Sequence, residues 1–370
     1  MDFDFTDDQR RTQQAARHFA ERVLAPRAAD VDRQGQLNAE AREELGTAGW
    51  LGMTIPEALG GSGGDVTSAV LAIEELAAAC ANSASFVGAN ILAARTIRAF
   101  GSEAQRSTLV SDLGRGNTSI VVASFDPDQL PTEVMEARRR DDGSYELHGR
   151  ANVAGLFGAF VHAIVFARTD DVWTAFVVPY SAPNLYVTVL PASFGKRAAN
   201  LGTLSFDGVV VSEAAILGVT GAGLDVARSL LADARILAAA EAIGVARGAY
   251  ERAVLHIKGL PKSTEPGLLG TQVLIADMCV EIEAARLLTL RAARQAENEV
   301  VSGAERSIAK LFATEMASRV VHKAMQIVGV RNVLATPSLE RNQRDARVGE
   351  LSEDGLDTQR AVIARTMLKA

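Results

Sequence analysis

The sequence predicts a mainly α protein with a β domain in its middle. Apolar residues recur at the three-to-four spacing of a helix face in the first and last parts of the chain, whereas polar and apolar residues alternate in short β-branched runs between them. The length of 370 residues allows two or three domains. We therefore expect an N-terminal helical domain at 1–115, a middle β domain at 116–218 and a C-terminal helical bundle at 219–370.

The N-terminal part is expected to contain four helices. Thr6 and Gln9 have the spacing of a capping box and mark the start of the first helix, which we expect to end at Pro26 because proline interrupts a helix. The glycine-rich stretch 55–65 predicts a loop. Three further helices are predicted by apolar periodicity, at 38–46, 66–81 and 85–100.

The middle part contains seven short runs that are typical of strands, rich in β-branched and aromatic residues and separated by turn residues. The pair Asp142-Gly143 lies between the second and third runs and predicts a hairpin. The runs lie at 119–125, 134–140, 144–149, 162–169, 173–179, 185–190 and 203–211.

The last part is expected to form a bundle of long helices rich in alanine and leucine, which pack closely against one another. These helices are predicted at 222–258, 268–300 and 304–328, with a final one after Asp357. The stretch 261–267, with two prolines and a glycine, predicts a surface loop between two of them.

Residues 340–360 are unusually dense in charge. Glu350, Glu353 and Asp354 lie there among four arginines, so a carboxylate in this segment has neighbours that tune its pKa for work as a general base. The alternative is a solvated turn between two helices, and the residues alone favour that turn.

Composition and charge exclude several classes of function. The formal net charge of −7 provides no general attraction to nucleic acid or to an anionic membrane. No HExxH motif or Cys/His cluster predicts a metal site. Cys80 and Cys279 lack CxxC spacing, and we expect two buried, reduced thiols. The acidic N-terminus does not have the character of a signal peptide, and no apolar run reaches the ~18 residues of a spanning helix, so the expected location is the cytoplasm.

The same charged segment carries a family resemblance. RDARV at 344–348, the acid at 353 and QRAVIAR at 359–365 resemble the C-terminal ending of the acyl-CoA dehydrogenase family. Further segments resemble other motifs of that family in the same order: IPEALGGSGGD, LHGRANVAGLFGAFVHAIVFART, FGKRAANLGTLSFDGVVV and ARILAAAEAIGVARGAYERAV. The resemblance covers nearly the whole chain and implies the family's fold, in which a middle β-barrel or sandwich domain separates helical domains, the last a four-helix bundle.

The resemblance also implies a function: α,β-dehydrogenation of an acyl-CoA, with hydride transfer to FAD and electrons passed on to an electron-transferring flavoprotein. Glu353 occupies the place of the family's catalytic glutamate, and Arg235 the place of the arginine beside it. Asp233, near an alternative position for the base, is a weaker candidate.

Several flavin-binding positions depart from the family pattern. Ser124 remains as a hydrogen-bonding group in the strand-loop 124–131, whereas 153–155 reads Val-Ala-Gly where the family has Trp-Ile-Thr. Lys258 stands in place of an arginine, a change that keeps the charge and loses the bidentate fork. Gln326 and Gly329 remain at the position that approaches the FAD pyrophosphate, but Val330 replaces a glycine.

These departures leave three hypotheses. The chain is one subunit of a heteromeric acyl-CoA dehydrogenase, of two α and two β chains, that acts on a bulky acyl- or steroid-CoA with a second acyl-CoA dehydrogenase chain as partner. Alternatively, it is a self-sufficient homo-oligomer, such as a homotetramer, acting on an acyl-CoA or on an acyl group bound to a carrier protein. The third hypothesis is a non-catalytic paralogue that scaffolds a dehydrogenase complex.

Overall fold

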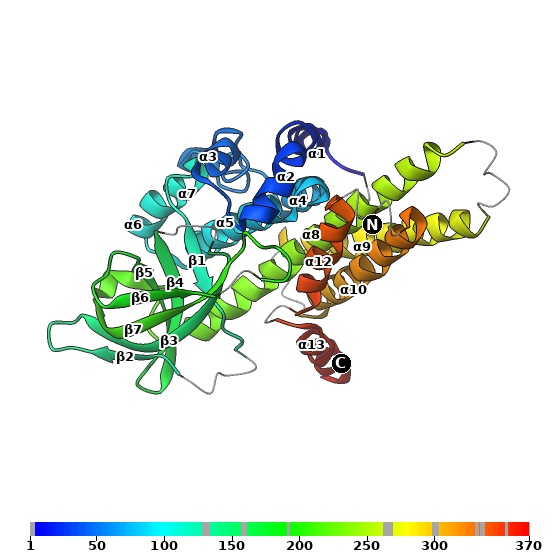
Figure 1. The fold of residues 1–370 in the computed structure, drawn as a ribbon. Helices are drawn as coiled ribbons and strands as arrows, with labels where there is room; N and C mark the ends of the chain where they lie inside the picture. The colour runs from blue at the N-terminus through cyan, green and yellow to red at the C-terminus, as the bar shows by residue number, and fades with distance from the viewer. Residues whose placement is uncertain are drawn as a thin grey trace.

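A computed structural model shows helices at both ends of the chain and a β-sheet between them (Figure 1). It describes residues 4–127, 134–156, 161–190, 193–261, 269–297, 303–329, 333, 337–351 and 354–369. Within these residues, no helix has both the length and the apolar character that a membrane crossing requires.

The N-terminal part is helical and begins with the predicted capping box, in which Thr6 and Gln9 exchange backbone-to-side-chain hydrogen bonds of 3.0 and 3.2 Å. The prediction that Pro26 ends the first helix is wrong. A π-helical turn at Ala20–Leu24 precedes the proline, which then lies in the first turn of the next α-helix, where its missing N–H costs little. The α-helices are α1 (Asp7–Phe19), α2 (Ala25–Gln34), α3 (Ala39–Thr47), α4 (Val66–Ala79), α5 (Ala81–Phe100), α6 (Glu103–Gln105) and α7 (Ser111–Arg115).

The strands form one eight-stranded sheet with the order β6-β7-β3-β1-β4-β5-β8, and β2 pairs with β3 and β4 off this path. All seven predicted strand runs are confirmed, and so is the hairpin at Asp142-Gly143, which joins β2 to β3. The two-residue strand β8 is too short for its alternation to be recognised in the sequence. The bounds are β1 (Ile120–Ala123), β2 (Glu136–Arg139), β3 (Tyr145–Ala154), β4 (His162–Thr169), β5 (Val172–Pro179), β6 (Leu185–Val189), β7 (Leu201–Val211) and β8 (Ile216–Leu217).

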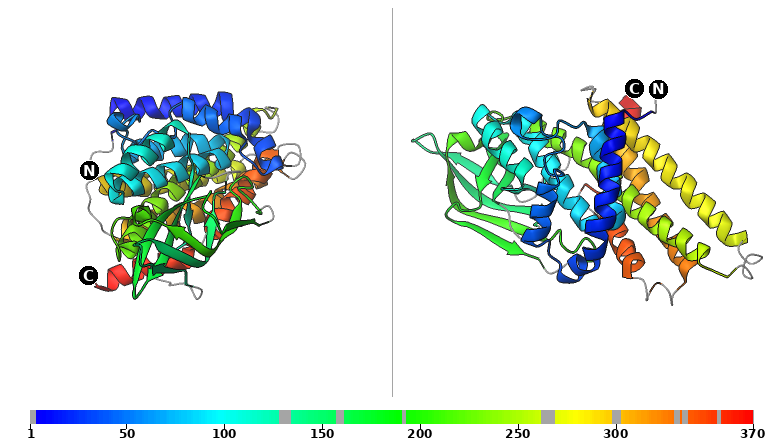
Figure 2. Two further views of the ribbon diagram at one scale, coloured as in Figure 1. Left: turned by 90° about the vertical axis from the view of Figure 1, so that its left-hand side faces the viewer. Right: turned by 90° about the horizontal axis from the view of Figure 1, so that it is seen from above.

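The two faces of the sheet belong to different apolar cores. One face buries Leu147, Phe176 and Leu204 in the core of the β domain itself. The opposite face, which includes Ile164, packs against residues of the surrounding helices, among them Ile97 of α5. The sheet therefore packs against the N-terminal helices, and Figure 2 shows the two side by side from two directions.

Among the described residues, five helices of at least 14 residues follow the sheet, and α8 runs from the sheet through the middle of the bundle (Figure 1). Glycine allows α8 to approach α4 closely, because a Cβ on Gly244 would lie 2.3 Å from the backbone oxygen of Glu74. The bounds are α8 (Gly223–Lys258), α9 (Leu269–Glu297), α10 (Gly303–Val328), α12 (Pro337–Leu351) and α13 (Leu356–Lys369). The predicted loop at 261–267 falls almost wholly outside the described residues.

Two expectations from the sequence are corrected by the C-terminal part. Residues 340–351 are not a solvated turn, because they belong to helix α12 and bury Arg344 and Asp345 against other parts of the chain. Because so many of these residues are charged, apolar periodicity did not predict the helix. Cys80 is buried as expected, but Cys279 is exposed on α9, so the expectation of two buried thiols is wrong for the second cysteine.

Candidate active site

Asp354 lies at the centre of a buried ionic cluster between three helices. Arg235 of α8 donates to both carboxylate oxygens of Asp354, from Nε to Oδ2 at 2.9 Å and from a terminal nitrogen to Oδ1 at 3.1 Å. The ammonium of Lys310, on α10, contacts Oδ2 at 3.2 Å and the backbone oxygen of the same residue. Gln359 of α13 donates to that backbone oxygen at 3.0 Å. Glu353, the expected base, precedes Asp354 in the chain and lies outside the described residues.

Burial and neighbouring charges shift the pKa values of this cluster in opposite directions. Burial favours the neutral form of Asp354, but the hydrogen bond from Arg235 and the charge of Lys310 outweigh it, and the pKa of the carboxyl lies below its ordinary value. Burial also lowers the pKa of the Lys310 ammonium, against the attraction of Asp354. Asp354 is therefore an ionised, fully bonded anion and a weak acceptor for a substrate proton.

A second cluster joins the loop before β7 to the helices around it. The Lys196 ammonium lies 2.5 Å from Oε1 of Glu241 on α8, and its backbone N–H donates to Asp345 of α12 at 2.6 Å. Arg344 pairs with Asp32 of α2 at 2.6 Å. Burial raises the pKa of Asp345 to about 6, against the hydrogen bond from the Lys196 amide. The charged residues of the RDARV motif thus connect the sheet, α2 and α12.

Asp233 is not free to act as a base in this arrangement. Its carboxylate receives a hydrogen bond of 2.7 Å from Arg95 of α5, and both side chains are mostly buried. This ion pair fixes α8 to α5, so its geometry is that of a structural contact.

The strand ends bring together the two segments in which the flavin motifs depart most from the family. Val153 pairs with Ala123 in the β1–β3 ladder, and the Ser124 amide donates to Asn152 at 2.8 Å. Val153 points into the core of the β domain and is almost fully buried. Ser124 and the Val-Ala-Gly segment at 153–155 therefore lie side by side near the ends of β1 and β3, two inner strands of the sheet.

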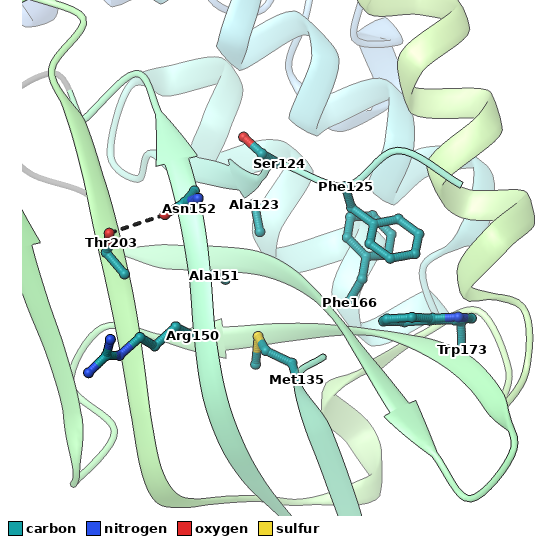
Figure 3. A pocket seen from close by; sticks show the side chains of 10 residues that line it. All are labelled: Ala123, Ser124, Phe125, Met135, Arg150, Ala151, Asn152, Phe166, Trp173 and Thr203. Atoms are coloured by element: carbon teal, nitrogen blue, oxygen red, sulfur yellow. Dashed lines mark hydrogen bonds between the residues drawn. The ribbon is translucent and has the colours of Figure 1, made fainter. Parts of the chain in front are cut away.

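A cavity of about 410 Å³ lies beside Ser124, and Asn152 and Thr203 form part of its lining (Figure 3). The hydroxyl of Thr203 donates to the amide oxygen of Asn152 at 3.2 Å. Phe125 closes one side of the cavity and stacks on Phe166, with ring centroids 4.8 Å apart. The wall of the cavity is thus polar along β3 and β7 and aromatic beside β4.

Lys258, Gln326 and Gly329 lie at the opposite end of the bundle from Arg235. Lys258 is the last residue of α8, about 35 Å from Arg235 at 1.5 Å per helical residue. Gln326 is exposed near the end of α10, and Gly329 follows that helix with a φ of 76° and open space above its Cα. Within one chain these three residues are far from Arg235 and Asp354.

Comparisons with known proteins agree with this arrangement of elements. Two family models match, the acyl-CoA dehydrogenase N-terminal domain at residues 6–117 and the acyl-CoA dehydrogenase C-terminal domain at 221–368. The chain is also 31% identical to a probable acyl-CoA dehydrogenase of Bacillus subtilis, with 100% of each chain covered. The chain belongs to the acyl-CoA dehydrogenase family. Among other members, it is 32% identical to the mitochondrial short-chain specific acyl-CoA dehydrogenase of Bos taurus, over 96% of this chain and 89% of that one.

The structure of butyryl-CoA dehydrogenase from Megasphaera elsdenii matches this acyl-CoA dehydrogenase with a TM-score of 0.93 at 31% identity, over 100% of both chains. Membership of the family makes the protein an oxidoreductase that acts on the CH–CH bond of an acyl-CoA and depends on FAD. The described residues contain no group of three or more His, Cys, Asp or Glu side chains that could hold a metal ion.

The donor groups of this acyl-CoA dehydrogenase fit FAD as two separate halves. The Ser124 hydroxyl and the Asn152 amide both line the cavity and offer hydrogen bonds there. At the far end, Lys258 offers a positive charge and Gly329 a surface without a side chain, which suits an anionic phosphate group.

Sequence reasoning found Arg235 and named Asp354, but it missed Lys310 and Lys196. Lys310 is one of two lysines in an alanine-rich helix, and its 3% exposed surface is a property of the packed bundle. Lys196 is part of the FGKR segment, and nothing in that segment indicated that its lysine would form a buried ion pair.

Proposed function

We propose that the chain abstracts the α-proton of an acyl-CoA with Glu353, in the α,β-dehydrogenation for which FAD, when bound, supplies the hydride acceptor. The support is the ion pair of Arg235 with Asp354, because it anchors to the bundle the residue that follows Glu353 in the sequence. A base has to lie within hydrogen-bond reach of the proton it removes, so a fixed backbone beside it is what the reaction needs.

The roles of the remaining residues follow from their positions. Arg235 and Lys310 bind Asp354 and contribute positive charge near the base. Ser124 is expected to hydrogen-bond the flavin bound beside its own sheet, whereas Lys258, Gln326 and Gly329 contact the FAD held by another subunit. Electrons then leave to an electron-transferring flavoprotein.

We infer a multi-subunit assembly from two observations. Ser124 lies in the β domain, whereas Lys258, Gln326 and Gly329 lie at the end of the bundle away from Arg235, so a site built from both groups needs two chains. In addition, α9 exposes Leu269, Val273, Val280 and Leu287, of which the last three recur every seven residues. Such spacing puts apolar side chains on one stripe, which is typical of a helix that packs on another helix. Figure 2 shows α9 on the side of the bundle away from the sheet.

The partner is proposed to be a second acyl-CoA dehydrogenase chain, and the substrate a bulky acyl- or steroid-CoA. The eroded motif at 153–155 supports a partner that supplies flavin contacts, because Val-Ala-Gly offers neither the aromatic ring nor the hydroxyl of the family's Trp-Ile-Thr. The second candidate is a homo-oligomer acting on a short acyl-CoA. The similarity to proteins named as short-chain and butyryl-CoA dehydrogenases favours it.

Two measurements test these proposals. The visible absorption spectrum and native mass of the chain, expressed alone and together with a neighbouring dehydrogenase chain, distinguish a homo-oligomer from a heteromer, because stoichiometric FAD and activity in the chain alone remove the need for a partner. Turnover of butyryl-CoA, octanoyl-CoA and a steroid side-chain CoA thioester then ranks the substrate classes. Absence of turnover in both preparations supports the scaffolding paralogue.

The Glu353→Gln variant tests the base directly. We expect turnover to be abolished and FAD to stay bound, since glutamine keeps the size of glutamate and loses its proton affinity. An unchanged rate removes Glu353 from the mechanism.

A further inference from the structure

Three aromatic side chains meet at one side of the cavity beside Ser124. The ring of Phe125 stacks on that of Phe166, with centroids 4.8 Å and planes 18° apart, and lies 4.6 Å from the ring of Trp173 at a tilt of 55°. All three residues line the cavity, and Figure 3 shows their rings grouped on the side opposite Thr203. The packing of the sheet therefore assembles an aromatic wall, made of Phe125, Phe166 and Trp173.

Phe125 is the member of this aromatic wall that has surface left for a ligand. Phe166 is 4% exposed and Trp173 8% exposed, and both belong to the core between the sheet and the helices. Phe125 is only half-buried and packs against that core from outside. Its ring is held in place by the two rings behind it, so it needs little ordering when a ligand covers it. Covering the remaining apolar surface of the ring is also favourable, because that surface leaves water.

The cavity has the chemistry of a planar ring system with one polar and one apolar end. Ser124, Asn152 and Thr203 place hydrogen-bonding groups on one side, and the aromatic wall forms the other. The volume of about 410 Å³ lies within the range of small-molecule sites. The isoalloxazine ring of FAD has a pyrimidine end rich in hydrogen-bonding groups and an apolar dimethylbenzene end, so the two sides of the cavity match its two ends.

Position 153 cannot supply the aromatic contact to that ring. The family motif that this chain resembles has tryptophan there, whereas Val153 is 1% exposed and points into the core of the β domain. Val153 is also not among the residues that line the cavity. In contrast, the Ser124 amide donates to the Asn152 carbonyl at 2.8 Å, which holds the segment that carries Phe125 next to β3.

We propose that Phe125 is a cofactor-binding residue whose ring, backed by Phe166 and Trp173, packs against the isoalloxazine in place of the tryptophan missing at position 153, an inference that rests on the proposed contact of Ser124 with the flavin. Aromatic rings attract one another beyond the burial of their area, so the contact contributes to FAD affinity. Trp173 then lies one ring away from the flavin. Because the chain has only two tryptophans, this position can be followed by spectroscopy.

FAD affinity tests the contact in whichever preparation holds FAD, the chain alone or the chain with its partner. Phe125→Leu keeps an apolar side chain and removes the ring, and we expect the Kd of FAD to rise about 3- to 10-fold. Phe19→Leu is the matched control, because Phe19 contacts Trp50 in the N-terminal helices, with centroids 5.8 Å apart and away from the cavity. F19L should leave the Kd unchanged, and an equal rise in both variants overturns the proposal.

Flavin fluorescence gives a second readout that does not depend on turnover. An indole near an excited flavin quenches its emission by donating an electron, and a phenol does the same. Trp173→Phe keeps the wall aromatic and should raise the emission of bound FAD, whereas Trp50→Phe should leave it at the wild-type level. Phe125→Tyr keeps the ring against the flavin and should lower the emission. Wild-type emission in both W173F and F125Y overturns the proposal, even where F125L does not fold.

Ser124→Ala separates this inference from the proposed place of the flavin. If S124A weakens FAD binding while F125L, F125Y and W173F behave as wild type, only the role of Phe125 falls. If S124A binds FAD normally and W173F raises the emission, Ser124 loses its proposed role and Phe125 keeps its own. FAD missing from both preparations, or unaffected by every one of these variants, overturns both.

Discussion

Arg235 binds Asp354 through two parallel hydrogen bonds of 2.9 and 3.1 Å, across 119 positions of the sequence. Each partner comes from a segment whose charge is visible in the sequence, but their contact is produced only by the packing of α8 against the C-terminal helices. The two-nitrogen geometry belongs to arginine, because lysine presents a single point charge.

Replacing Arg235 measures how much the two-nitrogen geometry contributes to the free energy of unfolding. We expect Arg235→Lys to lower the free energy of unfolding by roughly 1 kcal/mol, for one hydrogen bond lost with the charge retained, and Arg235→Ala by roughly 3 kcal/mol. Denaturant unfolding monitored by circular dichroism checks both values. Equal stabilities for the two variants would mean that the charge alone contributes nothing, whereas a wild-type stability of Arg235→Lys would mean that charge and not geometry governs the contact.

The buried carboxyl of Asp345 gives stability a pH dependence. Burial raises its pKa to about 6 in the folded state, above the ordinary value of an aspartate, so the folded state holds the proton more tightly. Stability relative to Asp345→Asn is therefore highest at or below pH ~4 and falls as the pH rises to about 6, by at most roughly 3 kcal/mol at about 1.4 kcal/mol per pKa unit.

Unfolding of wild type and D345N from pH 4 to 8 measures this difference. The asparagine oxygen can still accept the hydrogen bond from the Lys196 amide, so the comparison isolates the charge. A stability difference that grows in favour of wild type between pH 4 and 6 contradicts the predicted direction.

Gly244 is expected to be intolerant of any side chain. A Cβ there would lie 2.3 Å from the Glu74 backbone oxygen and 2.6 Å from the Cβ of Ala77, so α4 and α8 would have to separate. We expect Gly244→Ala to cost roughly 3 kcal/mol or to prevent folding. Gly88→Ala is the control, because its nearest neighbour would be Ile73 Cδ1 at 3.9 Å, and alanine in a helix should stabilise by roughly 0.5–1 kcal/mol.

The apolar stripe on α9 predicts where chains associate. A charge placed on it, as in Val280→Glu or Leu287→Glu, should lower the native mass and reduce bound FAD in parallel, since the proposed flavin site needs two chains. Val219→Glu is the control, because Val219 is 69% exposed outside the bundle. Native mass spectrometry and the flavin absorbance give both readouts, and an assembly that survives the α9 variants excludes this surface as the interface.

The local features of the fold could be predicted because they depend on neighbouring residues. The capping box at Thr6, the hairpin at Asp142-Gly143 and the strand alternation were all visible as short-range patterns. Helix α12 was not predicted, because its buried positions include the charged residues Arg344 and Asp345, whereas apolar periodicity detects a helix by buried apolar residues. The π-helical turn before Pro26 was not predicted either, because the effect of a proline on a helix depends on the backbone that precedes it.

By itself, the sequence determined the order of helices and strands, the family resemblance and the identity of the residues able to act. These depend on periodicity and on motifs, both of which are written along the chain. Only the tertiary structure decided which charges meet: Asp354 with Arg235 and Lys310, and Lys196 with Glu241. It also placed Lys258 and Gln326 away from Ser124. The physical reason is that burial, ion pairing and distance across a bundle arise from packing between segments far apart in the chain, which no local pattern encodes.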